Sequence, residues 1–120
     1  MKNVLIMLSA YNGHKYIREQ LDSLYAQKNV DFHILVRDDG SSDDTLSILQ
    51  EYQEKFGKMT IMSESNIGVA RSFHRLMLYA SEKMPYFDYY AFSDQDDVWM
   101  DEKLAYAVQR LEYDKACLYY

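Results

Sequence analysis

The chain has 120 residues, of which 48% are apolar and 27% charged, and its formal net charge is −6. This composition is typical of a folded globular protein rather than a disordered one, and the length fits one domain. The acidic balance argues against non-specific binding to nucleic acid or to an anionic membrane, because phosphate-rich partners select for clusters of Lys and Arg. A phosphorylated ligand would therefore need a divalent cation between itself and the protein.

The N-terminal run MKNVLIMLSA is too short for a secretory signal or a membrane span, and we interpret it as a buried strand. The chain has one cysteine, Cys117, which gives neither a disulfide framework nor a zinc-site spacing. We interpret Cys117 as a core residue and expect a reducing cytoplasm as the compartment.

Five apolar runs predict strands, at residues 3–8, 32–37, 59–62, 87–92 and 116–120. Their near-continuous apolar character suits a parallel sheet that is covered on both faces. Four other stretches space apolar residues three and four positions apart, which predicts helices that lie on a sheet with one side. The apolar positions of these helices are Ile17, Leu21 and Leu24; Leu46, Leu49, Tyr52 and Phe56; Val69, Phe73, Leu76, Met77 and Ala80; and Leu104, Val108 and Leu111. The alternation predicts a doubly wound α/β fold, whose ligand sites lie at the carboxyl ends of the strands.

The second helix carries the best boundary signals. Ser41 or Ser42 is suited to cap its N-terminus, and we expect Asp43 and Asp44 in its first turn, where the helix dipole favours negative charge. Gly57 is placed to end the helix.

A polar cluster follows each of the first four predicted strands. The clusters are SAYNG (residues 9–13), DDGSSDDT (38–45), SESNIGVAR (63–71) and SDQDDVW (93–99). Because the carboxyl ends of parallel strands meet at one edge of a sheet, we expect the four clusters to converge there. Their convergence predicts a single binding site.

The cluster after the second strand allows two interpretations. Asp-Gly-Ser is ordinary turn chemistry, which suffices to explain Asp38. Asp39 lies one residue further out, and its carboxylate can accept a hydrogen bond from a ligand such as the ring N–H of a pyrimidine base.

The cluster after the fourth strand brings together Asp94, Asp96 and Asp97. Helix capping and a solvated acidic loop would be a purely structural explanation. Carboxylates separated by one residue can instead surround a hard cation such as Mg²⁺ or Mn²⁺, which shares its remaining positions with phosphate oxygens. We expect Trp99 to anchor this loop to the core.

Three other kinds of residue, namely Arg, Tyr and His, are candidates for a role in binding. Arg71, at the start of the third helix, is suited either to a diphosphate or to a surface ion pair. Tyr11 can stack on a base or plug the sheet edge. His14, His33 and His74 have no metal-ligand spacing, and we expect all three to be structural or exposed.

Taken together, SAYNG, VRDDGSSDDT, NIGVARSF and SDQDDVW resemble the nucleotide-sugar-binding half of a family 2 glycosyltransferase with the GT-A fold, a Rossmann-like, mostly parallel sheet flanked by helices. The resemblance covers essentially the whole chain, with the motifs in the right order and spacing. The forms SDQDDVW and VRDDGS are similar to those of bacterial rhamnosyltransferases of surface polysaccharide synthesis.

The resemblance implies a role for each matching residue. Ser9 and Tyr11 would line the base and ribose pocket, and Asp39 would bond a uracil or thymine ring. Asp94 and Asp96 would form the DxD pair that holds Mg²⁺ or Mn²⁺, with Asp96 as the direct metal ligand. The nucleotide-binding set implied in this way is Ser9, Tyr11, Asp39, Arg71, Asp94 and Gln95.

The resemblance also implies what the chain lacks. Members of the family are longer, and their later half carries the acceptor site and the general base, so no residue here is assigned as that base. We expect residues 1–120 to be a single nucleotide-sugar-binding domain of a longer cytoplasmic protein, peripheral to the inner face of the membrane, whose acceptor is a glycan or a lipid-linked sugar. Missing strands would leave a sheet edge that favours self-association as a homo-oligomer.

Two other classes of protein are alternatives to a glycosyltransferase. A signalling receiver domain has a similar length and an acidic Mg²⁺ pocket, but it predicts an acidic pair after the first strand and a Lys after the fifth, which this chain lacks. A purely structural or interaction module leaves the four polar clusters unexplained.

Overall fold

The structure is a computed structural model of the chain and describes residues 1–94 and 96–114. It contains four strands and four helices in strict alternation: β1 (Asn3–Ala10), α1 (Ile17–Tyr25), β2 (Asp31–Asp39), α2 (Thr45–Phe56), β3 (Met59–Glu64), α3 (Val69–Lys83), β4 (Tyr89–Ser93) and α4 (Lys103–Asp114). This order confirms the predicted α/β alternation. The predicted strand at 116–120 and the predicted core residue Cys117 lie outside the described residues.

The four strands form one sheet in the order β3-β2-β1-β4, with every neighbouring pair parallel. β1 lies in the interior of the sheet, where it pairs with β2 along its whole length and with β4 over Val4 to Leu8. A parallel sheet needs a crossover between consecutive strands, and the helices provide these crossovers.

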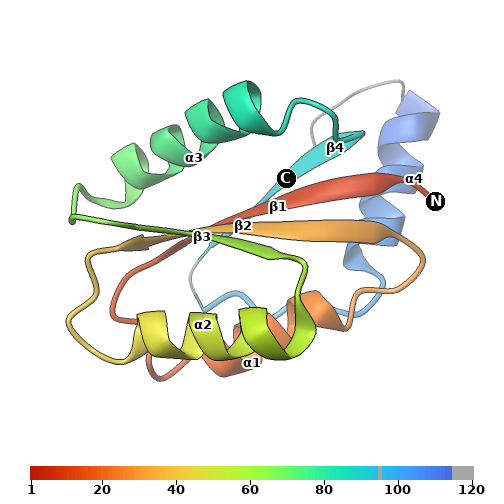
Figure 1. Ribbon diagram of the computed structural model, residues 1–120. Coiled ribbons are helices and arrows are strands. Elements are labelled where there is room, and N and C mark those ends of the chain that lie inside the picture. Colours follow the sequence, from red (N-terminus) through yellow and green to blue (C-terminus); the bar gives the residue numbers. More distant parts are fainter. Residues whose placement is uncertain (95, 115–120) are drawn as a thin grey trace.

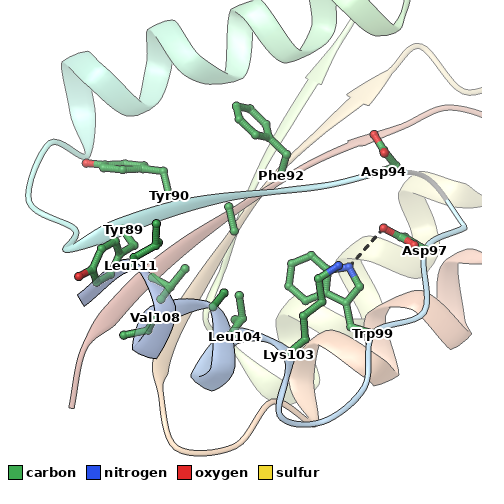
Figure 2. A pocket seen from close by; sticks show the side chains of 13 residues that line it. Tyr89, Tyr90, Phe92, Asp94, Asp97, Trp99, Lys103, Leu104, Val108 and Leu111 are labelled. Carbon is green, nitrogen blue, oxygen red and sulfur yellow. Dashed lines mark hydrogen bonds between the residues drawn. The ribbon is translucent and has the colours of Figure 1, made fainter. Parts of the chain in front are cut away.

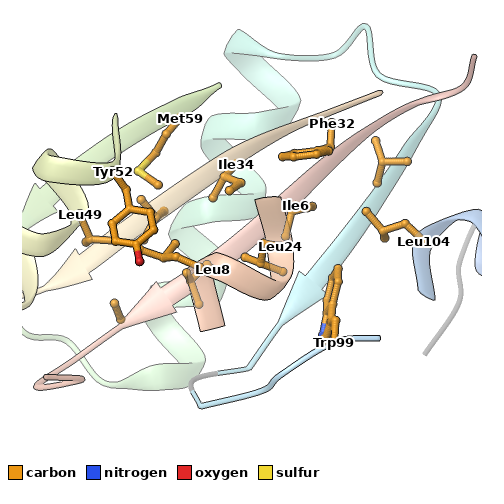
Figure 3. Packing of buried hydrophobic residues seen from close by; sticks show 14 of the residues in the cluster. Ile6, Leu8, Leu24, Phe32, Ile34, Leu49, Tyr52, Met59, Trp99 and Leu104 are labelled. Carbon is orange, nitrogen blue, oxygen red and sulfur yellow. The ribbon is translucent and has the colours of Figure 1, made fainter. Parts of the chain in front are cut away.

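Helices cover both faces of the sheet. Figure 1 shows α3 on one side and α1 and α2 on the other. The alternation of side chains along β1 and β2 supplies both layers, because successive residues of a strand point to opposite faces. Ile6, Leu8 and Ile34 pack with α1, α2 and α4, whereas Leu5 and Leu35 pack with α3. Figure 3 shows the first of these layers, in which Trp99 and Leu104 extend the core beneath β4.

Most predicted helix positions are buried, including all three in α1 and all three in α4, but three predictions are wrong. Phe56, Val69 and Met77 have exposed fractions of 51%, 66% and 44%. Phe56 is the last residue of α2 and rests on the ring of Tyr25 rather than under the sheet. Val69 begins α3 and Met77 lies toward the β4 edge, so neither has a strand above it to bury it.

The predicted N-terminus of α2 is also wrong. The helix begins at Thr45 with Asp44 as its N-cap residue, and neither Ser41 nor Ser42 caps it. Ser41 instead donates to Asp38, and Asp43 lies before the helix, where its carboxylate accepts from the backbone of Thr45. At the other end Gly57 follows the helix with a φ of 67°, which confirms the predicted helix end.

Within residues 1–94 and 96–114, no helix has both the length and the apolar character needed to cross a membrane.

Candidate functional site

The sheet brings the four polar clusters to one edge. The register aligns Ala10 with Asp38 and Asp38 with Ser63, while Leu8 is aligned with Ser93. The four strands therefore end side by side. This arrangement confirms the predicted convergence, and it divides the clusters between two neighbouring cavities.

The first cavity has a volume of about 370 Å³ and opens between the ends of β1 and β2 and the start of α3. It is lined by Ser9, Tyr11, Asp39, Asn66, Gly68 and Val69. Three of the six are residues that the sequence assigns to nucleotide binding. Tyr11 is 45% exposed at the mouth of the cavity, whereas Ser9 and Asp39 are buried in its floor.

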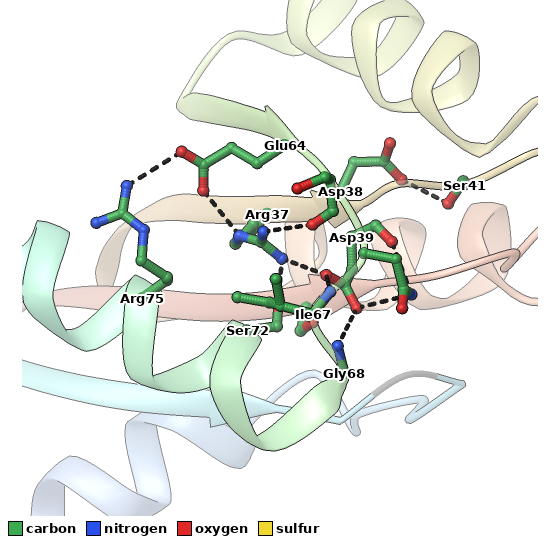
Figure 4. A network of polar contacts seen from close by, with 12 residues as sticks. Arg37, Asp38, Asp39, Ser41, Glu64, Ile67, Gly68, Ser72 and Arg75 are labelled. Atoms are coloured by element: carbon green, nitrogen blue, oxygen red, sulfur yellow. Dashed lines mark hydrogen bonds and ion pairs between the residues drawn. The ribbon is translucent and has the colours of Figure 1, made fainter.

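Asp39 of this cavity forms a buried ion pair with Arg37, which Figure 4 shows. Arg37 and Asp39 are two residues apart on β2 and therefore point to the same face, toward α3. The guanidinium donates from Nη1 to Oδ1 of Asp39 at 2.5 Å, and the side chains are only 2% and 3% exposed. Neither group reaches water, so the charge of Asp39 depends on Arg37 for its compensation.

Arg37 also ties the neighbouring elements together. It donates to Glu64 at the end of β3, to the carbonyl of Ser65 and to Oγ of Ser72 on α3. Ser9 on β1 donates in turn to Ser72 at 2.6 Å. We call Arg37, Asp39, Glu64, Ser72 and Ser9 the strand-end network.

Two pKa values record the electrostatics of this network. Burial opposes the charge of Arg37, but hydrogen bonds to Asp39 and Glu64 outweigh it, and the pKa of Arg37 is raised. Hydrogen bonds from Arg75 and Arg37 lower the pKa of Glu64. Arg37 and Glu64 are therefore held in their charged forms.

The carboxylate of Asp39 has all its acceptor positions in use. Oδ1 accepts from Arg37 and from the backbone N–H of Ile67, and Oδ2 accepts from the backbone N–H of Gly68 and from Nδ2 of Asn66. A carboxylate offers about four such positions. A ligand N–H that bonds Asp39 must therefore replace one of these donors.

The side chain of Asp38 points to the opposite face of the sheet, and its contacts support the interpretation of this segment as a turn. It is buried, and it accepts from Oγ of Ser41 at 2.5 Å. Ser41 in turn accepts from the backbone N–H of Asn12, which joins the first two polar clusters. Gly40 permits the close approach of the third, because a Cβ there would lie 2.7 Å from the backbone nitrogen of Asn66.

The second cavity, of about 280 Å³, lies between α3 and the end of β4 and is lined by Ala70, Phe73, His74, Met77, Phe92 and Asp94. α3 begins between the two cavities, since Gly68 and Val69 line the first and Ala70 and Phe73 line the second. Arg71 lies on the same turn of α3 and is exposed.

The acid loop, residues 93–99, follows β4. Asp94 and Asp96 are exposed and Asp97 is half-buried. Asp96 adopts a φ of 64°, which turns the chain back so that the N–H of Asp97 reaches the carbonyl of Asp94. Gln95 lies outside the described residues, so its predicted role remains a prediction.

Trp99 anchors the acid loop to the core, as predicted. Its side chain is 6% exposed, and its indole N–H donates to Asp97. Figure 2 shows the ring beneath a further apolar cavity of about 210 Å³ between β4 and α4, with Asp94 and Asp97 at one end and Lys103 over the indole face.

A buried glutamine shapes the acid loop from below. Gln20 on α1 is fully buried, and its amide donates to Oγ of Ser93 and to the carbonyl of Asp94. Its Oε1 accepts from the backbone N–H of Asp96. α1 thereby fixes the backbone of the loop while leaving the carboxylates outside.

The carboxylates of Asp94 and Asp96 are exposed to solvent, and their predicted role as metal ligands stays a prediction. Among the residues that the structure describes, no protein group bonds the carboxylates of Asp94 or Asp96, and no cluster of three or more His, Cys, Asp or Glu could enclose a metal. Mg²⁺ and similar ions are commonly held by one or two carboxylates together with substrate phosphates rather than by a complete protein cage. Asp94 and Asp96 match that partial donor set.

The histidines behave as expected. His33 is half-buried in β2 against Thr60, and burial lowers its pKa. His14 and His74 are exposed, and His14 contacts Asp44.

Sequence reasoning missed Arg37, Ser72, Asn66 and Gln20. Arg37 carried a signal, because it stands two residues before Asp39 and therefore shares its face of the strand. Gln20 carried another, because it is a polar residue within the apolar side of α1. Ser72 and Asn66 lie within NIGVARSF, one of the motifs that carry the resemblance, but no local pattern separates them from the other loop and helix residues of that motif.

Comparison with known proteins agrees with this geometry. The family model of glycosyl transferase family 2 matches residues 5–120. The dTDP-rhamnosyl transferase RfbG of Shigella flexneri is 36% identical over 115 residues, which are 93% of this chain and 39% of that protein.

Two solved structures share the fold. S. aureus TarS superposes with a TM-score of 0.79 and 28% identity, over 96% of this chain and 20% of TarS. TarS 1-349 has also been solved in complex with UDP-GlcNAc. The mannosyltransferase PcManGT of Pyrobaculum calidifontis, in complex with GDP-Man and Mn²⁺, has a TM-score of 0.79 and 25% identity over 90% of this chain and 32% of its own.

The chain belongs to glycosyl transferase family 2, and its α/β sheet has the GT-A fold that the resemblance implied. It spans about two fifths of the length of RfbG and smaller fractions of the two solved proteins. The family match excludes the receiver-domain and structural-module alternatives.

Proposed function

We propose that this chain is the nucleotide-sugar-binding domain of a longer inverting glycosyltransferase, acting in bacterial surface glycan synthesis. The observation that carries the proposal is the pair of adjacent cavities at one sheet edge, one lined by Ser9, Tyr11 and Asp39 and the other by Asp94. The relatives that match most of the chain include a dTDP-rhamnosyl transferase, which favours a UDP- or dTDP-sugar as the donor.

The first cavity is proposed to hold the base and ribose. Tyr11 offers an aromatic face at the mouth, and the carboxylate of Asp39 can accept from the ring N–H of uracil or thymine. Asn66 is the replaceable donor on Asp39, because its amide belongs to an exposed residue, whereas Arg37 is buried.

The diphosphate is proposed to lie over the start of α3, between the two cavities. The unpaired N–H groups of a first helical turn favour an anion, and Arg71 on that turn adds a positive charge. Asp94 and Asp96 would hold Mg²⁺ or Mn²⁺ against the phosphate oxygens, and Gln95 between them would contact the nucleotide. The bound cation would neutralise charge that builds on the diphosphate leaving group.

In the parent enzyme an acceptor hydroxyl attacks the anomeric carbon and the diphosphate leaves. The residues of this chain bind and orient the donor, while the general base belongs to the rest of the protein. We therefore expect this chain to bind a nucleoside diphosphate without transferring a sugar. The glycan or lipid-linked acceptor would likewise be bound elsewhere, at the cytoplasmic face of the membrane.

Calorimetric titration tests the proposal. The 120-residue chain should bind UDP or dTDP in the presence of Mn²⁺, and the Asp96→Ala variant should bind at least tenfold more weakly, since one of two metal ligands is lost. Glu19→Ala, an exposed change on α1, serves as the control and should bind as the wild type does. No binding by the wild type, or equal binding after Asp96→Ala, would sink the proposal.

The outer edge of β4 is proposed to be covered in the parent protein. Beside β4 the face toward α3 carries an apolar groove of about 530 Å³ that includes Met77 and Phe92, both well exposed. An uncovered edge of this kind favours self-association. Sedimentation of the isolated chain should show a homo-oligomer that Phe92→Lys dissociates, and a wild type that is monomeric at all concentrations would contradict this.

A further inference from the structure

We propose that Arg37 is a positioning residue that sets base selectivity, by holding the Asp39 carboxylate at the floor of the first cavity. This inference rests on the proposed function, because it concerns how the base is chosen at the proposed nucleotide site. Arg37 does not line the cavity, so it would act only through Asp39.

The burial of Arg37 supports a positioning role rather than a role in stability alone. Its side chain is 2% exposed, and a buried ion pair is often no more stable than well-packed apolar residues of similar volume. A strand end that needed only stability would be served equally well by apolar residues in place of both Arg37 and Asp39. The guanidinium instead supplies direction, because its N–H groups have a fixed planar geometry.

The contacts of Arg37 leave its plane little freedom. Nε donates to Glu64 at 2.9 Å, Nη2 to the carbonyl of Ser65 at 2.8 Å, and Nη1 to Ser72 at 3.1 Å as well as to Asp39. The acceptors belong to β2, β3, the following loop and α3. Arg37 thus fixes the position of Asp39 Oδ1 relative to β2, β3, the following loop and α3. β1 is connected to the same group through the hydrogen bond from Ser9 to Ser72.

Asp39 in turn holds the backbone that forms the wall of the cavity. Its two oxygens accept from the backbone N–H groups of Ile67 and Gly68, at 2.8 and 3.1 Å. With Arg37 on one oxygen and these amides on both, the carboxylate cannot rotate without breaking several bonds. The remaining donor, Asn66, can be replaced by a base N–H without moving the carboxylate.

This geometry distinguishes bases by their hydrogen-bonding pattern. Uracil and thymine present a ring N–H at N3, whereas N3 of cytosine is an acceptor that faces a carboxylate unfavourably. A site built to bond an N–H rejects an analogue that lacks it, provided the acceptor is fixed. Loosening Asp39 should therefore weaken UDP more than CDP.

The test is to measure UDP and CDP affinities, with Mn²⁺, for the wild type and for Arg37→Lys. Lysine keeps the charge but not the planar fork, and the ratio of UDP to CDP affinity should fall on the order of tenfold through loss of UDP binding. Arg75→Lys is the matched control, because Arg75 also bonds Glu64 but is not among the groups that bond Asp39. It should leave the ratio unchanged.

Two further variants keep the test decisive. In an Asp39→Asn background, Arg37→Lys should change the ratio no further, since the group through which it acts is gone. If Arg37→Lys does not fold, Ser72→Ala removes one acceptor of the guanidinium and should lower the ratio by about two- to fivefold.

The outcomes separate the two proposals. A wild type that binds neither nucleotide overturns the proposed function and this inference together. A wild type that binds UDP selectively, with Arg37→Lys and Ser72→Ala weakening UDP and CDP equally, leaves the proposed function standing and makes Arg37 merely structural. A wild type without preference between the two nucleotides also overturns the inference alone.

Discussion

The strand-end network and the acid loop lie at the same sheet edge and carry similar numbers of carboxylates, but these carboxylates differ in burial and in hydrogen bonding. In the network Asp39 is buried and every acceptor position is filled by the protein. In the acid loop the backbone is fixed by Gln20, while the carboxylates of Asp94 and Asp96 face solvent. The buried carboxylate has its hydrogen-bond acceptors filled within the protein, whereas the exposed carboxylates are left open to solvent.

The largest expected effect is the loss of stability when the buried ion pair of the strand-end network is broken. Arg37→Leu leaves the Asp39 carboxylate buried without its cation, so the free energy of unfolding should fall by about 3–5 kcal/mol in urea denaturation. Arg75→Leu removes an ion pair in which Arg75 is 43% exposed and should cost less than about 1 kcal/mol. Equal losses would mean that burial of the pair is unimportant.

The acid loop should depend on Gln20 to a smaller degree. Gln20→Met fits the apolar surroundings but removes the acceptor of the Asp96 N–H and the donor to Oγ of Ser93 and to the Asp94 carbonyl, which should cost about 1–3 kcal/mol. Amide exchange of Asp96 should become faster at the same time. The neighbouring exposed change Glu19→Met should lie within about 0.5 kcal/mol of the wild type, and a Gln20→Met variant that does the same would contradict the assigned role.

Acid should weaken the network through Glu64. Hydrogen bonds from Arg75 and Arg37 lower its pKa below the ordinary 4.5, so the unfolded chain takes up the proton first. The stabilisation is complete above that ordinary pKa and is lost as pH falls through the folded value. The urea midpoint should be measured at pH values between 6 and 3, on the order of one unit apart. It should fall less steeply with decreasing pH for Glu64→Gln than for the wild type, and Arg75→Leu should give an intermediate slope. Identical slopes for all three chains would refute this.

The smallest effect on stability is expected for substitutions of Asp96. Its φ of 64° is a left-handed conformation that glycine adopts without strain, so Asp96→Gly should be more stable than Asp96→Ala by about 1 kcal/mol. Thermal unfolding of the two variants measures the difference. Both variants should lose Mn²⁺-dependent UDP binding equally, and retained binding by either one would remove Asp96 from the metal site.

The sequence predicted the α/β alternation and the meeting of the polar clusters, because both follow from local patterns and from the parallel arrangement of strands. It placed Ser9, Tyr11 and Asp39 in one pocket by resemblance, and they line one cavity. The α2 cap was predicted wrongly because Ser41 has a partner in Asp38 that local propensity does not reveal. The network was missed for the same reason, since it joins Arg37 to Ser65 and Ser72 across 28 and 35 residues.

The pairing of β1 has a consequence for how the chain folds as it is synthesised. Its partner on one side, β2, begins at Asp31, but the first aligned residue of β4 on the other side is Tyr89, opposite Val4. During synthesis β1 therefore keeps one edge open until β4, more than 80 residues later in the sequence than Val4, has been made. Contacts so distant in sequence slow folding and leave strand edges exposed meanwhile. Among the described strands, the pairing of β1 with β4 is the last contact of the sheet that synthesis makes possible.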